Sequence, residues 1–173
     1  MRERTKGFPT AIAIFFFAAA LVWLLFFRPH AQVLEISLLT DQRVVWRSLA
    51  DRGEEFVISY VHSVNKRPVF DTLRLDGDRI VIVKSRFDSF GAGMPESSTG
   101  EGTLEFAPNG WLQWTVNRPV TDFVVRVGRV ADHRLFFRGK EYPLSAIGEP
   151  GSGLRFRARW MSLYEAMKGR CDS

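Results

Sequence analysis

The chain has 173 residues, of which 46% are hydrophobic and 25% are charged, a balance typical of one globular domain with a short additional segment. The formal net charge is +5, but residues 1–30 hold four basic residues against one acidic residue, which leaves only +2 for residues 31–173. So small a charge excludes the basic footprint of a nucleic-acid-binding domain. The only cysteine, Cys171, excludes an internal disulfide and a metal site built on thiolates.

An uncharged apolar segment runs from Phe8 to Phe27, and Thr10 is its only polar side chain. A helix of this length spans about 30 Å, the thickness of the hydrocarbon core of a bilayer. The segment is longer than the apolar core of a signal peptide, and bulky and basic residues follow it. We therefore expect an uncleaved transmembrane signal anchor over residues 8–27, with cleavage near Ala31 as the alternative.

Basic residues close to the ends of this segment predict its orientation. Three of them precede it, whereas Arg28 is the only one that follows closely. Because the more basic flank stays in the cytoplasm, residues 1–7 are expected to form a cytoplasmic N-terminus and residues 28–173 an exported domain. The predicted location is the cytoplasmic membrane, with a single span and the C-terminal domain in the periplasm or outside the cell.

Short apolar runs separated by turn residues dominate the exported part. Asp76-Gly77 and Pro108-Asn109-Gly110 are typical of hairpin turns. This pattern predicts an all-β fold, an antiparallel sandwich or partly open barrel of short strands, preceded by the transmembrane helix. A short amphipathic helix is expected over 161–168. The expected strands are 33–39, 44–49, 56–63, 69–75, 79–87, 103–106, 111–116, 123–127, 134–138 and 154–160.

The connection 88–102 is long for a compact domain and carries four glycines and three serines. A connection of this kind is usually functional or disordered. Its glycines permit positive φ or a close backbone approach, and their amides are candidates for binding an anion. A role confined to the turn is the equal alternative. The candidate ligand- or partner-binding residues here are Arg86, Asp88, Ser89, Gly91, Gly93, Pro95 and Glu96.

A second candidate group lies at the end of strand 56–63. Alternation places His62 on the same face as Tyr60. If a two-residue turn at 66–67 closes the hairpin, His62 lies directly opposite Asp71, close enough for an imidazole–carboxylate hydrogen bond. Such a pair would fix the tautomer of the histidine or raise its pKa. The alternative is a half-buried histidine with a structural role only.

Catalytic and metal chemistry find little support in the sequence. Ser63 follows His62 directly, so in a strand the two side chains point to opposite faces and cannot form a nucleophile–base pair. The three histidines are far apart, and no metal-binding spacing links them. We therefore expect no catalytic residue, no metal and no cofactor, with a hydrolase that uses His62 as a minor alternative.

Three stretches of the chain resemble the bacterial domain of unknown function 1850. They are Tyr60-Val-His-Ser-Val64, Pro68-Val-Phe-Asp71 and Arg86-Phe-Asp-Ser-Phe-Gly-Ala-Gly-Met-Pro95. The family usually has Glu where this chain has Asp71, a change that keeps the carboxylate and shortens its reach. Members of that family are small and often carry an N-terminal membrane segment. They tend to be encoded beside TAXI-type TRAP transporters, which import carboxylates with an extracytoplasmic binding protein.

The resemblance and the apolar segment together suggest a function. We expect a membrane-anchored, non-catalytic accessory protein of such a transporter, which docks on its membrane subunit or on its solute-binding protein. The alternative is a binding domain for a small carboxylate, with Arg86 and the amides of residues 91–93 as the receptor groups. The membrane itself is an expected partner, and nucleic acid is not.

Overall fold

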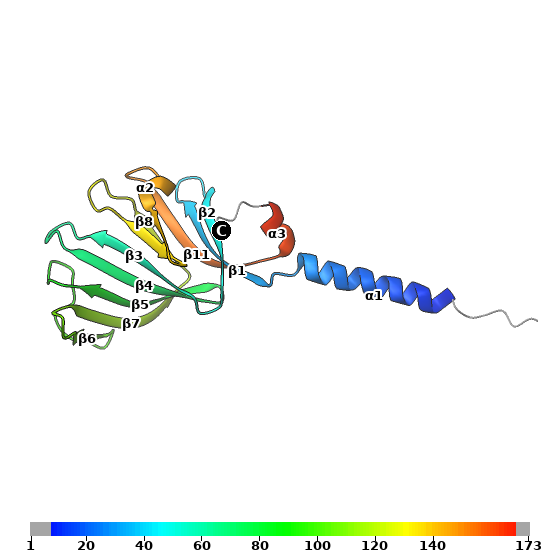
Figure 1. Ribbon diagram of the computed structural model, residues 1–173, viewed down its shortest axis with the longest axis horizontal. Helices are drawn as coiled ribbons and strands as arrows, with labels where there is room; N and C mark the ends of the chain where they lie inside the picture. The colour runs from blue at the N-terminus through cyan, green and yellow to red at the C-terminus, as the bar shows by residue number, and fades with distance from the viewer. Residues whose placement is uncertain (1–7, 169–173) are drawn as a thin grey trace, which may run out of the picture.

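The computed structural model describes the backbone of residues 8–168 and the side chains of residues 11–165. Two antiparallel sheets face each other, and the helix α1 (Phe8–Phe27) extends away from them as a rod (Figure 1). Among the described residues, no helix is both long enough and apolar enough to cross a bilayer. The expected cytoplasmic segment 1–7 and Cys171 lie outside the described residues.

The smaller sheet has four strands in the order β2-β1-β11-β8, and the larger sheet has seven in the order β10-β9-β3-β4-β5-β7-β6. Two short helices, α2 (Leu144–Ile147) and α3 (Leu163–Lys168), complete the domain. The strands are β1 (Ala31–Leu38), β2 (Val44–Ala50), β3 (Glu55–Val61), β4 (Pro68–Asp76), β5 (Arg79–Phe87), β6 (Thr103–Phe106), β7 (Leu112–Val120), β8 (Asp122–Arg126), β9 (Arg134–Phe137), β10 (Lys140–Pro143) and β11 (Gly153–Met161).

The predicted all-β class is confirmed, and the two sheets do not close into a barrel. Each expected strand is present, with ends that differ by a few residues. The expected C-terminal helix is α3, which follows β11. Strand β10 and helix α2 were not predicted from the sequence, because β10 has four residues and three of them are polar or proline.

The main hydrophobic core lies between the two sheets. Leu34 and Ile36 on β1 and their ladder neighbours on β11 are buried, because alternate residues of each strand point to the same face. An aromatic stack joins the sheets: the Phe123 ring lies 4.7 Å from that of Phe156 and 6.4 Å from that of Phe56, measured between centroids. Phe56 belongs to the larger sheet and the other two to the smaller sheet, so the stack fixes how the sheets face each other.

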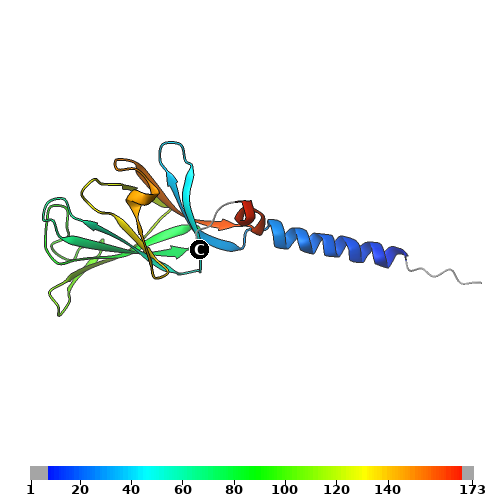
Figure 2. The ribbon, with the colours of Figure 1, turned by 45° about the horizontal axis from the view of Figure 1, so that its top comes forward.

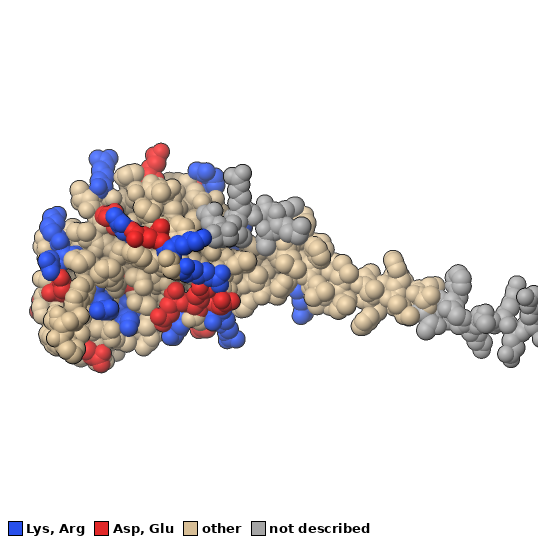
Figure 3. Space-filling model, in the orientation of Figure 1, with Lys and Arg blue, Asp and Glu red and all other residues tan. Residues whose placement is uncertain are grey.

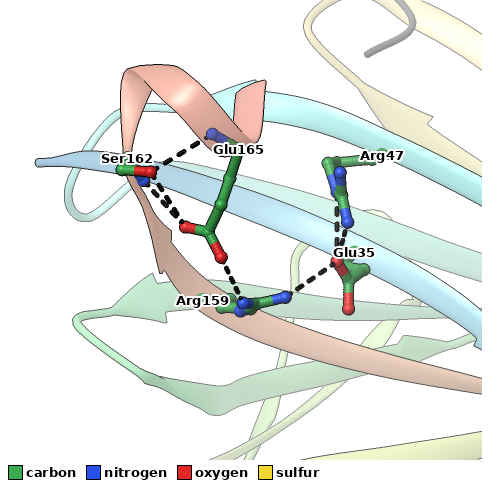
Figure 4. A network of polar contacts seen from close by, with 5 residues as sticks. All are labelled: Glu35, Arg47, Arg159, Ser162 and Glu165. Carbon is green, nitrogen blue, oxygen red and sulfur yellow. Dashed lines mark hydrogen bonds and ion pairs between the residues drawn. The ribbon is translucent and has the colours of Figure 1, made fainter. Parts of the chain in front are cut away.

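The outer face of the smaller sheet carries a buried ion pair. Arg47 on β2 donates to Glu35 on β1 with an Nη2–Oε2 distance of 2.5 Å, and their side chains are 11% and 8% exposed. Arg159 on β11 lies 3.8 Å from the same carboxylate and also donates to Glu165 on α3 (Figure 4). Ser162 and Glu165 cap each other's backbone N–H groups at the start of α3. The network therefore ties three strands and the last helix together.

Two further views show how the domain is arranged around α1. β1 and β11 run side by side and end next to α1 (Figures 1 and 2). The ring of Tyr164 on α3 lies 5.2 Å from that of Phe27 at the end of α1. Acidic and basic side chains are interspersed on the visible face of the β domain, whereas the described part of the rod is almost free of them (Figure 3).

Glu35→Ala is expected to lower the free energy of unfolding by about 3–5 kcal/mol, because it leaves Arg47 buried without its carboxylate. Urea unfolding followed by circular dichroism measures the loss. Glu165→Ala is the matched control and should cost about 1 kcal/mol, since that pair is more exposed. Equal costs for the two variants would contradict a special role for the buried pair.

Candidate functional site

A cavity of about 430 Å³ opens between the two sheets. The inward faces of β3, β4 and β5 form one wall, and β8 forms the opposite wall. Much of the lining is aliphatic, as expected for the space between two sheets. Six polar side chains also line it: Tyr60, Asp71, Ser85, Arg118, Arg126 and His133.

Asp71 faces the interior because its ladder partner on β3 is Ile58, a residue of the main core. On its other side it pairs with Ser85 on β5, whose hydroxyl donates to Asp71 Oδ1 at 2.5 Å. Burial raises the pKa of Asp71, and the hydrogen bond from Ser85 opposes that rise. The second carboxyl oxygen makes no hydrogen bond with a described residue and is not enclosed, so a ligand in the cavity can reach it.

Tyr60 and His133 form the neighbouring part of the lining. Burial, with a smaller effect of Asp71, raises the pKa of Tyr60 to about 12, so the phenol is neutral and can donate. The ring of His133 lies 5.6 Å from that of Tyr60. The N–H of Gly128 donates to His133 Nδ1 at 3.2 Å, and burial lowers the pKa of the imidazole. The histidine is therefore neutral with its proton on Nε2.

Two arginines complete the polar lining. Arg118 lies on β7, directly after Asn117, whose φ of 48° accompanies the bulge in the β5–β7 ladder. Among the described residues it has no hydrogen-bonding or ionic partner. Arg126 on β8 donates only to the carbonyl of Gly151, at 3.3 Å. Two guanidinium groups and a single carboxyl group thus line one cavity, which gives it an excess of positive charge.

The hairpin register predicted from the sequence is wrong. Val61 pairs with Pro68, and Asp71 faces Ile58, so His62 does not lie opposite Asp71. The physical reason is the length of the turn: residues 62–67 form it, instead of two residues. The N–H of His62 donates to the carbonyl of Arg67 at 2.9 Å, which ends the ladder four residues earlier than assumed.

The turn and the glycine-rich connection nevertheless come together. Asn65 Nδ2 donates to the carbonyls of Ser89 and Phe90, both at 3.3 Å. Arg67 Nε donates to Asp88 Oδ1 at 3.0 Å, and this hydrogen bond holds the pKa of Asp88 below its usual range. The connection is therefore a structured loop that the β3–β4 turn fixes in place.

Two positions in the loop require glycine, each for a different physical reason. A Cβ on Gly91 would lie 2.9 Å from Asn65 Nδ2 and 3.3 Å from His62 Cε1, so only glycine lets the two segments approach this closely. Gly93 has a φ of 84°, which side chains rarely adopt. Both roles were among those expected from the sequence.

The loop also covers a second hydrophobic cluster. Val69, Phe87 and Leu112 are buried there, and Met94 from the loop packs against them. A satellite cluster under a long loop is a common arrangement. The loop is thus needed to shield the part of the larger sheet that the smaller sheet does not cover.

The remaining predicted site residues lie apart from the cavity. Arg86 precedes Phe87 in β5 and so points to the opposite face of the sheet, where its guanidinium lies 5.4 Å from the ring of Trp111. It is therefore separated from the loop amides with which it was grouped. Ser63, Gly93 and Glu96 are exposed, and Pro95 is half-buried in the loop.

No catalytic arrangement surrounds His62 in the described part of the chain. Its Nδ1 accepts from the N–H of Val64 at 3.3 Å, and no hydroxyl donates to the ring. Three or more potential metal ligands do not gather anywhere within the residues that the structure describes. Of the predicted residues, Asp71 alone lies in the cavity.

Sequence reasoning missed Tyr60, Ser85, Arg118, Arg126 and His133 as members of one site. Tyr60 alternates with Phe56 and Ile58, and this pattern indicates core instead of function. His133 lies between β8 and β9, which belong to different sheets, so no local spacing links it to Tyr60. The only sequence signal was an acidic residue, Asp71, on the apolar face of a strand.

The model of a family described as "Domain of unknown function (DUF1850)" matches residues 56–144, about half of the chain. The matched segment begins in β3 and ends at the start of α2, and it contains every residue that lines the cavity. Strands β1, β2 and β11 lie outside it. No curated protein and no solved structure matches the chain.

The raised pKa of Asp71 predicts how its replacement changes stability. The pKa of Asp71 is higher in the folded chain than in the unfolded chain. Its contribution to the free energy of unfolding is therefore present at low pH and is lost as the pH rises through the folded-state pKa. Asp71→Asn keeps an acceptor for Ser85 and removes the charge. We therefore expect it to raise the free energy of unfolding at pH 7, by an amount on the order of 1 kcal/mol, and to lose this advantage near pH 4. Urea unfolding between pH 4 and 8 measures the difference.

Asp88→Asn provides the opposite case for the same experiment. The hydrogen bond from Arg67 lowers the pKa of Asp88. The stability that the Asp88 carboxylate contributes is therefore present at neutral pH and is lost as the pH falls through its folded-state pKa. This variant should be less stable than the unchanged chain at pH 7. A destabilising effect of Asp71→Asn at pH 7 would contradict the unfavourable burial of that carboxyl group.

Proposed function

The chain belongs to the family of the domain of unknown function 1850, and from that premise we propose that its β domain binds a small organic carboxylate between its two sheets. One observation carries the proposal. A partly buried carboxyl, a neutral phenol and a neutral imidazole converge in a cavity that two arginines also line. All of these groups lie in the segment that the family model matches.

The charges of the lining favour an anion. Arg118 has no ionic partner among the described residues, and Arg126 donates to one carbonyl only. A guanidinium group binds a carboxylate through two parallel hydrogen bonds, so either arginine can receive one. The volume of about 430 Å³ lies at the lower end of the range of about 300–1,000 Å³ for small-molecule sites.

The other polar groups suit a second functional group on the ligand. Tyr60 and His133 Nε2 offer hydrogen-bond donors, and the free oxygen of Asp71 offers an acceptor. The aliphatic part of the lining accommodates a short hydrocarbon body. A carboxylic acid that also carries a hydroxyl or carbonyl group therefore matches the cavity best.

Binding is proposed instead of catalysis because of how the nucleophile candidate is bonded. Ser85 carries the aliphatic hydroxyl of the cluster, and it donates to Asp71 instead of to an imidazole. Serine nucleophiles are usually activated by an imidazole or an amine, and neither group accepts a hydrogen bond from Ser85 among the described residues.

Membrane anchoring through α1 is part of the proposal. The sequence from Phe8 to Phe27 has no charged residue, and all side chains described in α1 are exposed. An exposed helix that is apolar on every side is expected to be covered by lipid or protein. The basic residues of the N-terminal flank support a cytoplasmic N-terminus and an exported β domain, which in a bacterium lies in the periplasm or outside the cell.

A role as an accessory of a solute transporter extends this proposal. A domain that holds a carboxylate close to the membrane is suited to receive it from, or pass it to, a carboxylate transporter. The membrane subunit or the solute-binding protein of such a transporter is the proposed partner. This step is supported by the proposed anchor and the proposed ligand class.

A panel of small hydroxy and keto acids should contain at least one compound that raises the melting temperature of the full chain in detergent, through mass action on the folded state. Arg118→Ala should weaken the apparent affinity for that compound by about tenfold or more, because a charge-assisted hydrogen bond is lost. Calorimetric titration measures the affinity.

Arg129→Ala is the matched control for that titration. Arg129 is an exposed arginine that does not line the cavity and has no ionic partner among the described residues. Its replacement should leave the affinity unchanged. A panel without any stabilising acid, or an Arg118→Ala variant with full affinity, would argue against the proposed site.

The transporter role has its own test. After mild detergent extraction from the native membrane, the tagged full chain is expected to co-purify with a subunit of a carboxylate transporter. Mass spectrometry identifies the recovered proteins. Recovery of the chain without such a subunit, also after chemical cross-linking in the membrane, would refute the accessory role and leave ligand binding untouched.

A further inference from the structure

A series of aromatic contacts joins the end of α1 to α3. The ring of Phe27 lies 6.2 Å from that of Trp23 within α1 and 5.2 Å from that of Tyr164 on α3, measured between centroids. The N–H of His30 donates to the carbonyl of Met161 at 3.0 Å, which ties the segment after α1 to the end of β11. Tyr164 therefore lies at the height of the last turn of α1.

Large apolar side chains are exposed on the segments next to this contact. Trp160 at the end of β11 is 37% exposed, and Leu163 and Tyr164 on α3 are 41% and 40% exposed. Phe27, which contacts Tyr164, is itself 48% exposed. Exposed apolar side chains that gather in this way mark a contact with a membrane or with another protein.

The charged groups nearby suit the headgroups of a bilayer. Arg28 directly follows Phe27, is exposed, and makes no hydrogen bond or ion pair through its guanidinium group within the described part of the chain. Glu165 in the first turn of α3 accepts from Arg159 and from the N–H of Ser162. The charge of Glu165 is thus compensated within the protein, and Arg28 is available for a lipid phosphate.

We propose that α3 and the end of β11 form a second membrane contact, in which Trp160, Leu163 and Tyr164 enter the headgroup region of the bilayer. This inference rests on the anchor proposed above. An α1 that spans the bilayer places Phe27 at the outer surface, and the ring of Tyr164 then lies at the same depth. Tryptophan and tyrosine favour this region, because each combines an apolar ring with a polar group. Lipid is therefore the occupant that we assign to the exposed side chains.

The second contact determines how the β domain is oriented on the membrane. A single span that continues into β1 through residues 28–30 gives the domain one point of attachment. α3 adds another, and its direction relative to β11 is fixed because Ser162 and Glu165 cap its first turn. Two points of attachment hold the cavity between the sheets at a constant height above the lipid.

Spin labels on the full chain in phosphatidylcholine liposomes measure the depth of each segment. Cys171→Ser removes the native thiol, and Leu163→Cys, Leu24→Cys or Val130→Cys then carries the nitroxide. The label at Leu163→Cys should be accessible to oxygen and lose most of its accessibility to a water-soluble nickel chelate, and the label at Leu24→Cys on α1 should lie deeper. Val130→Cys is the control, because Val130 is 79% exposed in the connection after β8, and its label should meet the chelate freely.

The three labels separate the second contact from the anchor. If the label at Leu24→Cys lies in hydrocarbon while that at Leu163→Cys meets the chelate as freely as that at Val130→Cys, the second contact is refuted and the anchor stands. If the label at Leu24→Cys also meets the chelate, the anchor fails and the inference fails with it. A label at Leu163→Cys that is shielded from oxygen and chelate alike would show that a second copy of the chain covers these side chains, which would overturn the assignment to lipid.

A second measurement needs no label. Lipids that carry bromine near the headgroup end of their acyl chains quench the fluorescence of a tryptophan that they contact, and the chain has five tryptophans. Trp160→Phe should lose part of the fluorescence intensity that these lipids quench, because it removes an indole from the lipid surface. Trp111→Phe, in the connection between β6 and β7, is the matched control and should keep the full quenched intensity. Equal quenched intensities for the two variants would contradict the contact at Trp160.

Discussion

The pairing of β1 with β11 is the constraint on which the rest of the structure depends. These are the first and last strands of the β domain, and they pair from Ala31–Met161 to Leu38–Leu154 without a register shift. Inward residues such as Leu34 and Phe156 enter the core, while Glu35 on the outer face is held by Arg47 and Arg159. A one-residue slip would exchange these two faces and expose the core residues. The register is thus fixed from both sides of the sheet.

The position of the proposed ligand site follows from that ladder. β8 pairs with the other edge of β11 and carries one wall of the cavity between the sheets. The smaller sheet has only four strands, so it cannot cover the whole of the seven-stranded sheet. The glycine-rich loop covers the remainder, through Met94 and the cluster around Phe87.

Local patterns in the sequence predicted most of the fold. Alternation identified the strands, and Asp76-Gly77 identified the β4–β5 hairpin, where Gly77 has a φ of 65°. The β3–β4 register could not be predicted, because the Asn65 side chain and the positive φ of Lys66 shape a six-residue turn whose sequence also permits a two-residue one. The assignment of β8 and β9 to different sheets depends on contacts between distant segments, and so does the meeting of Tyr60 with His133.

The free-energy cost of placing Asp71 between the sheets is an argument that the polar cluster binds a ligand. The core would close more favourably with an aliphatic side chain in place of Asp71, since its neighbours Ile58 and Leu73 are aliphatic and burial disfavours its charge. One hydrogen bond from Ser85 offsets part of that cost and leaves the second oxygen available to the cavity. A purely structural carboxyl group would be expected to use both oxygens or to form an ion pair. A partly buried group with a perturbed pKa, a free acceptor and access to a cavity is more consistent with a ligand-binding residue than with a packing residue.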